Sequence, residues 1–373
     1  MNTRQAFIGA LTLLFVLAGS SPPAVHAGTI TVTNTNDSGA GSLRQAIADA
    51  AFGDIIAFAP GLTGTITLTS GELSINKDLT IIGPGAASLA ISGNDASRVF
   101  HIFSGVTVSI YGVTIRNGNA ADGGGISNTG TLTLNNVIVT SNAATDDGGG
   151  IYNATGGTLT LTDVTISSNT ATDNGGGICV DDGTVTVTGV TIHGNNASNR
   201  GGGIFNDETV ILVNVTISGN TAGTVGGGIY NKYTATLTNV TISNNSGDGF
   251  FQDGYPYTSA TLKNTLLANN TAANCHLNRA LTSQGYNLSS DNSCAGSFTA
   301  AGDLNNTNPL LNPLADNGGA TQTHALQAGS PAIDAGTNTG CPSSDQRGVS
   351  RPLDGNGDGN AICDIGAFEH NRP

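Results

Sequence analysis

Tryptophan is absent from this sequence, and methionine occurs only at the first position. Aromatic residues make up 5% of the 373 residues and charged residues 10%, fractions that an enzyme of this length would normally exceed. Basic residues are especially scarce, 12 against 26 acidic ones, which leaves a formal net charge of −14. This shortage excludes nucleic acid as a partner and disfavours docking on an anionic membrane, because both need clustered Lys and Arg.

Long apolar runs are also lacking, except at the N-terminus. The run AFIGALTLLFVLA (6–18) follows Arg4 and is too short to span a bilayer, and the segment ends on a small residue, Ala27. We therefore expect residues 1–27 to be a signal peptide and the mature chain to have no transmembrane segment. The protein is then secreted or associated with the cell surface, and we expect it to be a monomer.

Glycine, in contrast, is abundant with 54 residues, and five glycine runs read GGGI. They begin at residues 123, 148, 175, 201 and 226, so the phrase recurs every 25 to 27 residues. No Lys and no helical pattern follow, which excludes a phosphate-binding loop. The runs are joined by phrases such as TLTLTDVTISSN, in which apolar residues alternate with Thr, Ser or Asn. This alternation is typical of strands with one buried face, so the repeat predicts an all-β parallel β-helix with three short strands per coil.

A column of asparagines follows the same repeat, five residues after the first residue of each VTI-like triplet. Stacked coils are about 4.8 Å apart, so the amides can hydrogen-bond from coil to coil. A structural ladder is favoured over an Asn-lined binding strip, because Asn also tolerates the backbone of a tight corner. The members are Asn142, Asn169, Asn195, Asn220, Asn245 and Asn270.

The two ends of such a solenoid need covers. The segment 28–54 contains SLRQAIADA, an amphipathic helix signal with Ser42 and Gln45 as a capping box. We assign residues 55–300 to the β-helix and 301–373 to a C-terminal cap. Two local disulfides are the simplest pairing of the five cysteines, although spacing leaves other pairings open. These pairs are Cys275 with Cys294 and Cys341 with Cys363, and Cys179 is left over.

Several phrases together resemble bacterial "choice-of-anchor Q" proteins. They are NTNDSGAGSLRQAI, the GGGIYN and NVTISNN coils, NPLLNPLADNGGATQTHALQAGSPAIDAG and DQRGVSRPLDGNGDGNAICDIGAFE. The resemblance implies a secreted right-handed parallel β-helix of the pectin-lyase-like superfamily, and no established reaction. The N-terminal phrase departs from the family pattern CSLREA, because GSLRQA has no Cys, and the usual C-terminal anchor is missing.

Acidic residues precede three successive glycine runs and are the candidate catalytic groups. In adjacent coils the carboxylates of Asp122, Asp147 and Asp173, with the neighbouring Asp146, can approach one another. Such a row can bind a cation or supply an acid and a base, but Asp is also an ordinary turn residue before Gly. No acid–base pair, metal triad or nucleophile triad accompanies it.

The C-terminal phrase DGNGDGNAICD matches the first half of a calcium loop. Its candidate ligands for Ca²⁺ are Asp354, Asn356, Asp358, Asn360 and Asp364, although Ile365 stands where a ligating Glu is expected. A Gly/Asp turn without metal is the alternative. Calcium here would stiffen the cap and do no chemistry.

Two further patterns suggest binding surfaces. GFFQDGYPY (249–257) gathers aromatic residues that can stack on sugars, but Phe250 and Phe251 can equally replace the usual Ile-Tyr pair of a coil. A column of threonines, including Thr191, Thr216 and Thr241, can bind ice or simply favour strands. The preferred hypothesis is a non-catalytic β-helix for adhesion or for binding an extracellular polysaccharide or surface receptor. The alternative is a polysaccharide lyase or glycoside hydrolase that uses the stacked aspartates.

Overall fold

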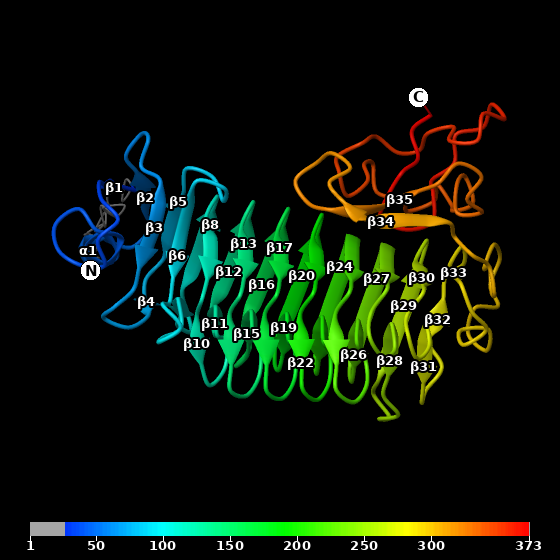
Figure 1. Cartoon of the computed structure of the whole chain (residues 1–373), viewed down its shortest axis with the longest axis horizontal. Helices are drawn as coiled ribbons and strands as arrows, with labels where there is room; N and C mark the ends of the chain where they lie inside the picture. Colours follow the sequence, from blue (N-terminus) through cyan, green and yellow to red (C-terminus); the bar gives the residue numbers. More distant parts are fainter. Residues whose placement is uncertain (1–26, 373) are drawn as a thin grey trace, which may run out of the picture.

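The computed structural model describes residues 27–372, so the expected signal peptide lies almost wholly outside the described residues. The chain winds into successive coils, and each coil adds parallel strands to the same sheets (Figure 1). The strand register follows the glycine repeat, because Ile126 pairs with Ile151 and Ile151 pairs with Ile178. The protein is therefore an all-β, right-handed parallel β-helix, as the repeat and the resemblance predict.

A 19-stranded sheet forms two of the walls, because each coil contributes two strands that meet at a bend. The first row comprises β1 (Thr29–Val32), β2 (Asp54–Phe58), β5 (Leu79–Ile82), β8 (Thr107–Tyr111), β12 (Thr131–Asn135), β16 (Thr158–Thr162), β20 (Thr184–Thr188), β24 (Thr209–Ser218), β27 (Thr234–Ser243), β29 (Ser259–Lys263) and β32 (Thr282–Ser283). The second row comprises β3 (Gly64–Thr67), β6 (Leu89–Ser92), β9 (Thr114–Arg116), β13 (Ile138–Thr140), β17 (Thr165–Ser167), β21 (Thr191–His193), the second halves of β24 and β27, β30 (Leu266–Ala268) and β33 (Leu288–Ser289).

A nine-stranded sheet forms the third wall, and a small five-stranded sheet lies at the corner before it. The nine strands are β4 (Leu73–Ile75), β7 (Phe100–Ile102), β11 (Ile126–Asn128), β15 (Ile151–Asn153), β19 (Ile178–Val180), β23 (Ile204–Asn206), β26 (Ile229–Asn231), β28 (Phe250–Gln252) and β31 (Cys275–Leu277). The two-residue corner strands are β10 (Asn119–Ala120), β14 (Ala143–Ala144), β18 (Thr170–Ala171), β22 (Asn196–Ala197) and β25 (Thr221–Ala222).

The interior of the helix is filled by the apolar columns that alternate in the sequence. In one coil, Leu159 and Leu161 from β16 and Ile166 from β17 are all fully buried, whereas Thr158, the first residue of β16, is exposed. The bend between the two strand rows needs a left-handed backbone, which Asn and Gly adopt at low cost. Asn136 and Gly189 have φ of 53° and 69° there. The alternation along each strand therefore places the apolar side chains of successive coils above one another in the interior.

The glycine runs lie where each coil turns into the nine-stranded wall, and they allow neighbouring coils to approach closely. A Cβ added to Gly176 would lie 2.5 Å from the carbonyl carbon of Asn196 and 2.6 Å from the carbonyl oxygen of Gly202. Real Cβ atoms do not occupy such positions, so the second glycine of the run is required by contact between coils. The runs are therefore a packing device and form no phosphate site.

An asparagine row runs along the inner corner, as stacked amides one coil apart. The Nδ2 atom of Asn169 donates to Oδ1 of Asn195 over 2.9 Å, and Asn195 donates to Asn220 over 2.9 Å. Each Oδ1 also accepts the backbone N–H of the preceding Asn, and each Nδ2 reaches a backbone carbonyl. These buried groups are satisfied by each other, which makes the row part of the core.

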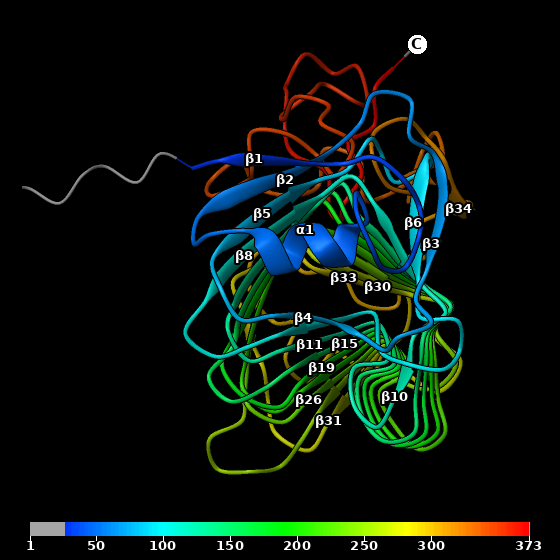
Figure 2. The same ribbon diagram turned by 90° about the vertical axis from the view of Figure 1, so that its left-hand side faces the viewer.

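Helix α1 (Leu43–Asp49) lies across the N-terminal end of the coils, as Figure 2 shows. Ser42 accepts the backbone N–H of Gln45, so half of the expected capping box is present. The other half is missing, because the backbone N–H of Ser42 donates to the carbonyl oxygen of Gly39 and the Gln45 side chain turns to Asp49. In the described residues, no helix is long and apolar enough to cross a membrane.

The C-terminal residues form a lobe against the flank of the last coils, which carries β34 (Leu311–Ala315) and β35 (Thr323–Leu326) (Figure 1). The lobe covers the threonine column: Thr216 donates to Gln346 over 2.6 Å, and Thr241 accepts the backbone N–H of Ala367 over 3.0 Å. Thr191, Thr216 and Thr241 are thus buried, and an ice-binding array at this column is excluded. The end of the core is covered by the preceding segment, which inserts Phe298.

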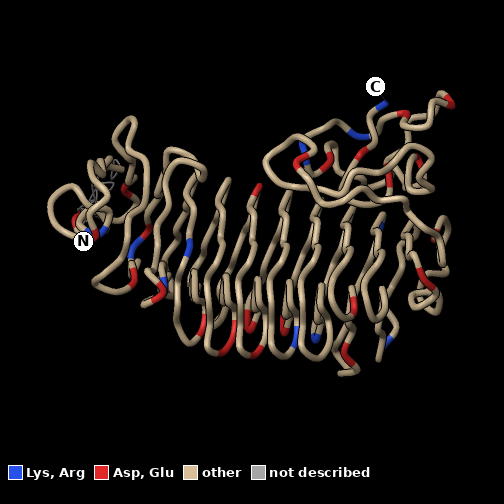
Figure 3. Tube along the Cα trace, in the orientation of Figure 1, with Lys and Arg blue, Asp and Glu red and all other residues tan. Residues whose placement is uncertain are grey.

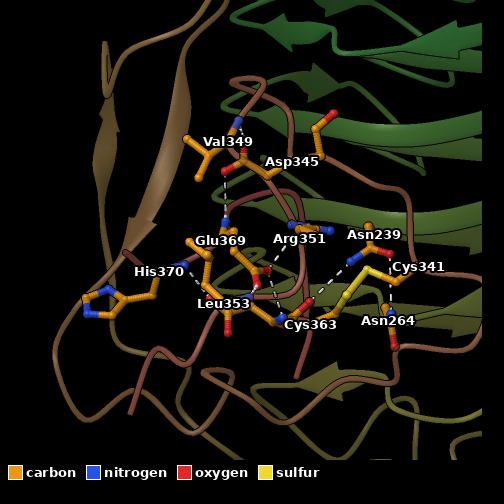
Figure 4. A network of polar contacts seen from close by, with 12 residues as sticks. Asn239, Asn264, Cys341, Asp345, Val349, Arg351, Leu353, Cys363, Glu369 and His370 are labelled. Carbon is orange, nitrogen blue, oxygen red and sulfur yellow. Dashed lines mark hydrogen bonds and ion pairs between the residues drawn. A yellow bond between two sulfur atoms is a disulfide. The ribbon is translucent and has the colours of Figure 1, made fainter. Parts of the chain in front are cut away.

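A buried ionic network holds the lobe together and accounts for the DQRGVSRP and CDIGAFE phrases (Figure 4). Nε of Arg351 lies 3.1 Å from Oε2 of Glu369, and both side chains are fully buried. Glu369 also accepts the backbone N–H groups of Leu353 and Asp364 over 2.8 and 3.0 Å. Burial and the nearby Glu369 charge raise the pKa of Asp364 to about 8. The disulfide Cys341–Cys363 closes this region, and Cys275–Cys294 joins β31 to the segment that covers the end of the core.

Candidate functional site

The acidic residues gather on the turns that lead into the nine-stranded wall (Figure 3). One carboxylate oxygen each from Asp146, Asp147 and Asp173 lies within 4.8 Å of the others, the one such group of three in residues 27–372. We call these three residues the acid cluster. The structure therefore brings Asp147 and Asp173 together with the neighbouring Asp146, and leaves Asp122 outside the group. Asp122 lies one coil away and accepts the backbone N–H of Asp147 over 3.3 Å.

Asp147 is the most perturbed member of the acid cluster. Burial raises its pKa to about 6, and the charges of Asp146 and Asp173 add to the effect. Asn174 opposes the shift, because its backbone N–H and its Nδ2 donate to the Asp147 carboxylate over 2.8 and 3.1 Å. Three close carboxylates can coordinate a hard divalent cation, and a carboxylate that titrates near neutral pH can accept or deliver a proton.

A column of side chains lies beside the acid cluster, on the outer face of the nine-stranded sheet. It is formed by the middle residue of each strand, and the rings of Phe205, Tyr230 and Phe251 stack with centroids 5.1 Å apart and planes within 9° of parallel. In the next coil, Phe251 pairs with Tyr230 and takes the outward position, and Phe250 pairs with Ile229 and takes the inward position. We call this set the ring column, and it comprises Tyr152, Cys179, Phe205, Tyr230, Phe251 and His276.

The ring column is hydrogen-bonded to one margin of this face. The hydroxyl of Tyr152 donates to Asp181 over 3.0 Å, and the hydroxyl of Tyr230 donates to Asp253, both in the turns that follow the strands. Cys179 lies inside the column, fully buried and outside either disulfide. Burial and the neighbouring carboxylates raise the pKa of the Cys179 thiol, so it stays protonated and is a poor nucleophile.

The basic groups near the acid cluster are already engaged. Arg98 donates through Nε to the carbonyl oxygen of Asp122 over 3.2 Å and pairs with Glu72 over 2.5 Å. The guanidinium of Arg200 lies 5.3 Å from the centre of the Tyr230 ring. Within residues 27–372, no ion pair reaches the acid cluster. Neither Arg98 nor the ring column is predicted from the sequence. The signal for the first four members of the ring column is the variable residue after GGGI, and Phe251 and His276 follow no such run.

The predicted calcium loop is folded by its own backbone amides. Asp354 accepts the N–H groups of Gly357 and Gly359 over 2.6 and 3.0 Å, and Asp358 accepts that of Asn360 over 2.8 Å. Asn356 accepts the N–H of Asp358 in the same way. Asp364 is buried apart from them, because its oxygens accept the N–H groups of Asp334 and His370. The structure does not bring Asp364 to the loop, and calcium binding there stays a prediction.

Comparisons with known proteins agree on the fold. A family model for a right handed beta helix region matches residues 125–309. No curated protein matches the chain. Among solved structures, the chain is similar to pectate lyase Pel9A, with a TM-score of 0.59 and 18% identity over 92% of this chain and 98% of that chain.

Two further structures are more distant. ORF18 of Geobacillus virus E2 has a TM-score of 0.35 and 14% identity, over 70% of this chain and 61% of that chain. The PL6 family alginate lyase AlyGC has a TM-score of 0.26 and 12% identity, over 93% and 60%. At these identities the likeness concerns the β-helix fold alone.

Proposed function

We propose that the protein is a secreted, non-catalytic β-helix protein that binds an extracellular polysaccharide along the outer face of the nine-stranded sheet. The observation behind this proposal is the alignment of polar groups at both margins of that face. Asp122, Asp147 and Asp173 precede β11, β15 and β19. On the other margin, Asp181 follows β19 and Asp207 follows β23. Because coils repeat about every 4.8 Å, a linear polymer can contact several coils at once, and weak contacts add.

The class of ligand and the compartment have separate support. The fold is shared with a pectate lyase, which supports a polysaccharide over other ligand classes. Two disulfides fit an oxidising compartment, and the N-terminal sequence fits export. A surface receptor with an extended, weakly basic face is the alternative partner of the same surface.

The use of the charged groups supports a non-catalytic role. Glycoside hydrolysis needs a carboxylic acid and a second carboxylate on either side of the scissile bond, whereas elimination needs a positioned base. Arg98 is held by backbone carbonyls and Glu72, and Arg200 lies over a ring of the ring column. The acid cluster therefore holds three carboxylates whose oxygens lie within 4.8 Å of one another, and in residues 27–372 no basic side chain forms an ion pair with it.

A carbohydrate-active enzyme is the second candidate, and one observation favours it. Asp147 has a pKa of about 6 beside two further carboxylates, which is suitable for proton transfer near neutral pH. In that case Asp147 would act as the acid or base, and Asp146 with Asp173 would hold a cation or the substrate.

The test is a panel of acidic and neutral polysaccharides, with the purified chain assayed for both retardation in affinity gels and release of reducing or unsaturated ends. The proposal expects retardation by at least one polymer and no cleavage of any. Cleavage that is lost in Asp147→Ala and kept in Asp49→Ala, an exposed acid on α1, would establish the enzyme instead. The absence of both retardation and cleavage across the whole panel would overturn the polysaccharide assignment.

A further inference from the structure

A second surface feature lies at the far margin of the same face, in the turns after β26 and β28. Tyr233 follows β26, and Tyr255 and Tyr257 belong to the longer turn between β28 and β29. These turns surround a hollow of about 230 Å³ that is lined by six side chains. We call it the tyrosine site, and its residues are Asp207, Glu208, Lys232, Tyr233, Tyr255 and Tyr257.

Exposed aromatic surface is concentrated at this place. Tyr255 is 54% exposed and Tyr257 is 74% exposed, in a chain with only 5% aromatic residues. The rings of Tyr233 and Tyr257 lie 6.4 Å apart at 36°, so their faces border one opening. Clustered exposed rings with polar residues at their rim are typical of a binding surface.

The turn that carries the rings is ordered by hydrogen bonds to the neighbouring coil. The hydroxyl of Thr258 donates to the carbonyl oxygen of Lys232 over 2.6 Å, and the N–H of Thr258 donates to that of Tyr255 over 3.0 Å. The N–H of Ser259 donates to the carbonyl oxygen of Tyr233 over 2.7 Å. A rigid turn presents its rings without an ordering cost on binding.

The charge of the tyrosine site restricts its ligand. Nζ of Lys232 pairs with Asp207 over 2.5 Å and lies 5.6 Å from the centre of the Tyr255 ring. Its single positive charge is therefore already matched, while Glu208 and the nearby Asp253 add negative charge. A uronate or sulfated sugar would bring a further negative charge against these carboxylates. An uncharged sugar meets no such repulsion.

We propose that the tyrosine site binds one neutral pyranose unit of a glycan. The apolar face of the sugar ring lies on Tyr233 and Tyr257, and its hydroxyls donate to Asp207 and Glu208. The ammonium of Lys232 donates to a ring or hydroxyl oxygen. This inference rests on the proposed polysaccharide binding and narrows the class of sugar to neutral units. The net charge of −14 on the chain also favours a neutral ligand over an anionic one.

The experiment titrates the full mature chain with neutral hexasaccharides of glucose, mannose and xylose and with a hexamer of galacturonate. The chain has no Trp, and three of its seven Tyr line the site, so a change in tyrosine emission that is lost in Tyr257→Ala reports occupation of the site. Calorimetry gives the affinity. We expect a neutral hexasaccharide to bind and Tyr257→Ala to weaken it by about tenfold or more, the loss of one stacking ring. Phe52→Ala, which removes a 65% exposed ring near the N-terminal end, should leave the affinity unchanged.

Each outcome decides the matter separately from the proposed function. Polymer retardation that persists with unchanged affinity in Tyr233→Ala and Tyr257→Ala overturns the tyrosine site and leaves polysaccharide binding in place. Tighter binding of the galacturonate hexamer, lost in Tyr257→Ala, overturns the neutral class. Hexasaccharide binding that depends on Tyr257 in a protein that retards no polymer supports the site and overturns the proposed function. No binding of any hexasaccharide overturns the site.

Discussion

The side-chain amide nitrogen of Asn195 lies 2.9 Å from the side-chain oxygen of Asn220, which belongs to the next coil. The same side chain donates to the carbonyl oxygen of Ile166 and accepts two hydrogen bonds from Asn169. One Asn thus links three successive coils through groups that water cannot reach.

Asn195→Ala should therefore destabilise the protein by about 3 kcal/mol or more, because several buried donors and acceptors lose their partners. The measurement is the midpoint of urea unfolding followed by far-ultraviolet circular dichroism. Asn196→Ala is the matched control, since the next residue is exposed and should change the midpoint little. Equal midpoints for the two variants would show that the row contributes no stability.

Gly202→Ala should destabilise the coil stack by about 2 kcal/mol or more, through overpacking between coils. The added Cβ would lie 2.3 Å from the carbonyl oxygen of Thr221 and 2.7 Å from that of Gly227. Gly296→Ala is the control, because its Cβ would meet no atom within 4 Å. Thermal unfolding of both variants measures the difference, and a Gly202→Ala protein as stable as the control would contradict the packing role.

The stability of the C-terminal lobe should fall as pH rises from about 4 to about 8. Asp364 has a pKa raised from 3.8 to about 8, so in this range the folded protein binds more protons than the unfolded chain. Stability is then greatest below the unfolded pKa and is lost as pH rises through the folded one.

Asp364→Asn should flatten this dependence, because the amide does not titrate. The readout is the slope of melting temperature against pH, since the absolute stability also changes when an NH₂ group faces the N–H of Asp334 or His370. A variant with the same slope as the native protein would assign the pH dependence to other groups.

Asp147→Asn should stabilise the protein at pH 8 and not at pH 4.5. The folded pKa of about 6 is raised, so ionisation of Asp147 costs stability as pH rises through 6. The site is only half-buried, so solvent screening limits the gain to a few tenths of a kcal/mol up to about 1 kcal/mol. Melting temperatures at both pH values in low and high salt test this. A gain that is equal at both pH values would contradict repulsion within the acid cluster.

The sequence predicts the coil because its signals are local and repeated. Alternation of Leu159 and Leu161 with Thr, and the interval between glycine runs, already determine which side chains point inward. The place of the C-terminal lobe has no such signal, since contacts such as Thr216 with Gln346 join residues 130 positions apart. A polar threonine column on the outer face looks the same in sequence whether water or another segment covers it.

The candidate site is less predictable for a related physical reason. Alternation shows that the residue after each GGGI faces outward, but Ser, Tyr, Cys, Phe and Tyr at this place share no obvious chemistry. Only coil stacking reveals that Phe205 and Tyr230 stack face to face. Likewise, spacing places Asp147 and Asp173 in adjacent coils, whereas the contribution of Asp146 depends on how one turn is folded.

The position of Cys179 has a practical consequence for studying this molecule. Four of the five cysteines are joined as disulfides, and the fifth is sealed within the central coils. A thiol-specific reagent can then label the native chain at one atom only, and only while the coils around β19 are parted. The labelling rate therefore measures how often the central coils open locally, and the native sequence already supplies the reporter.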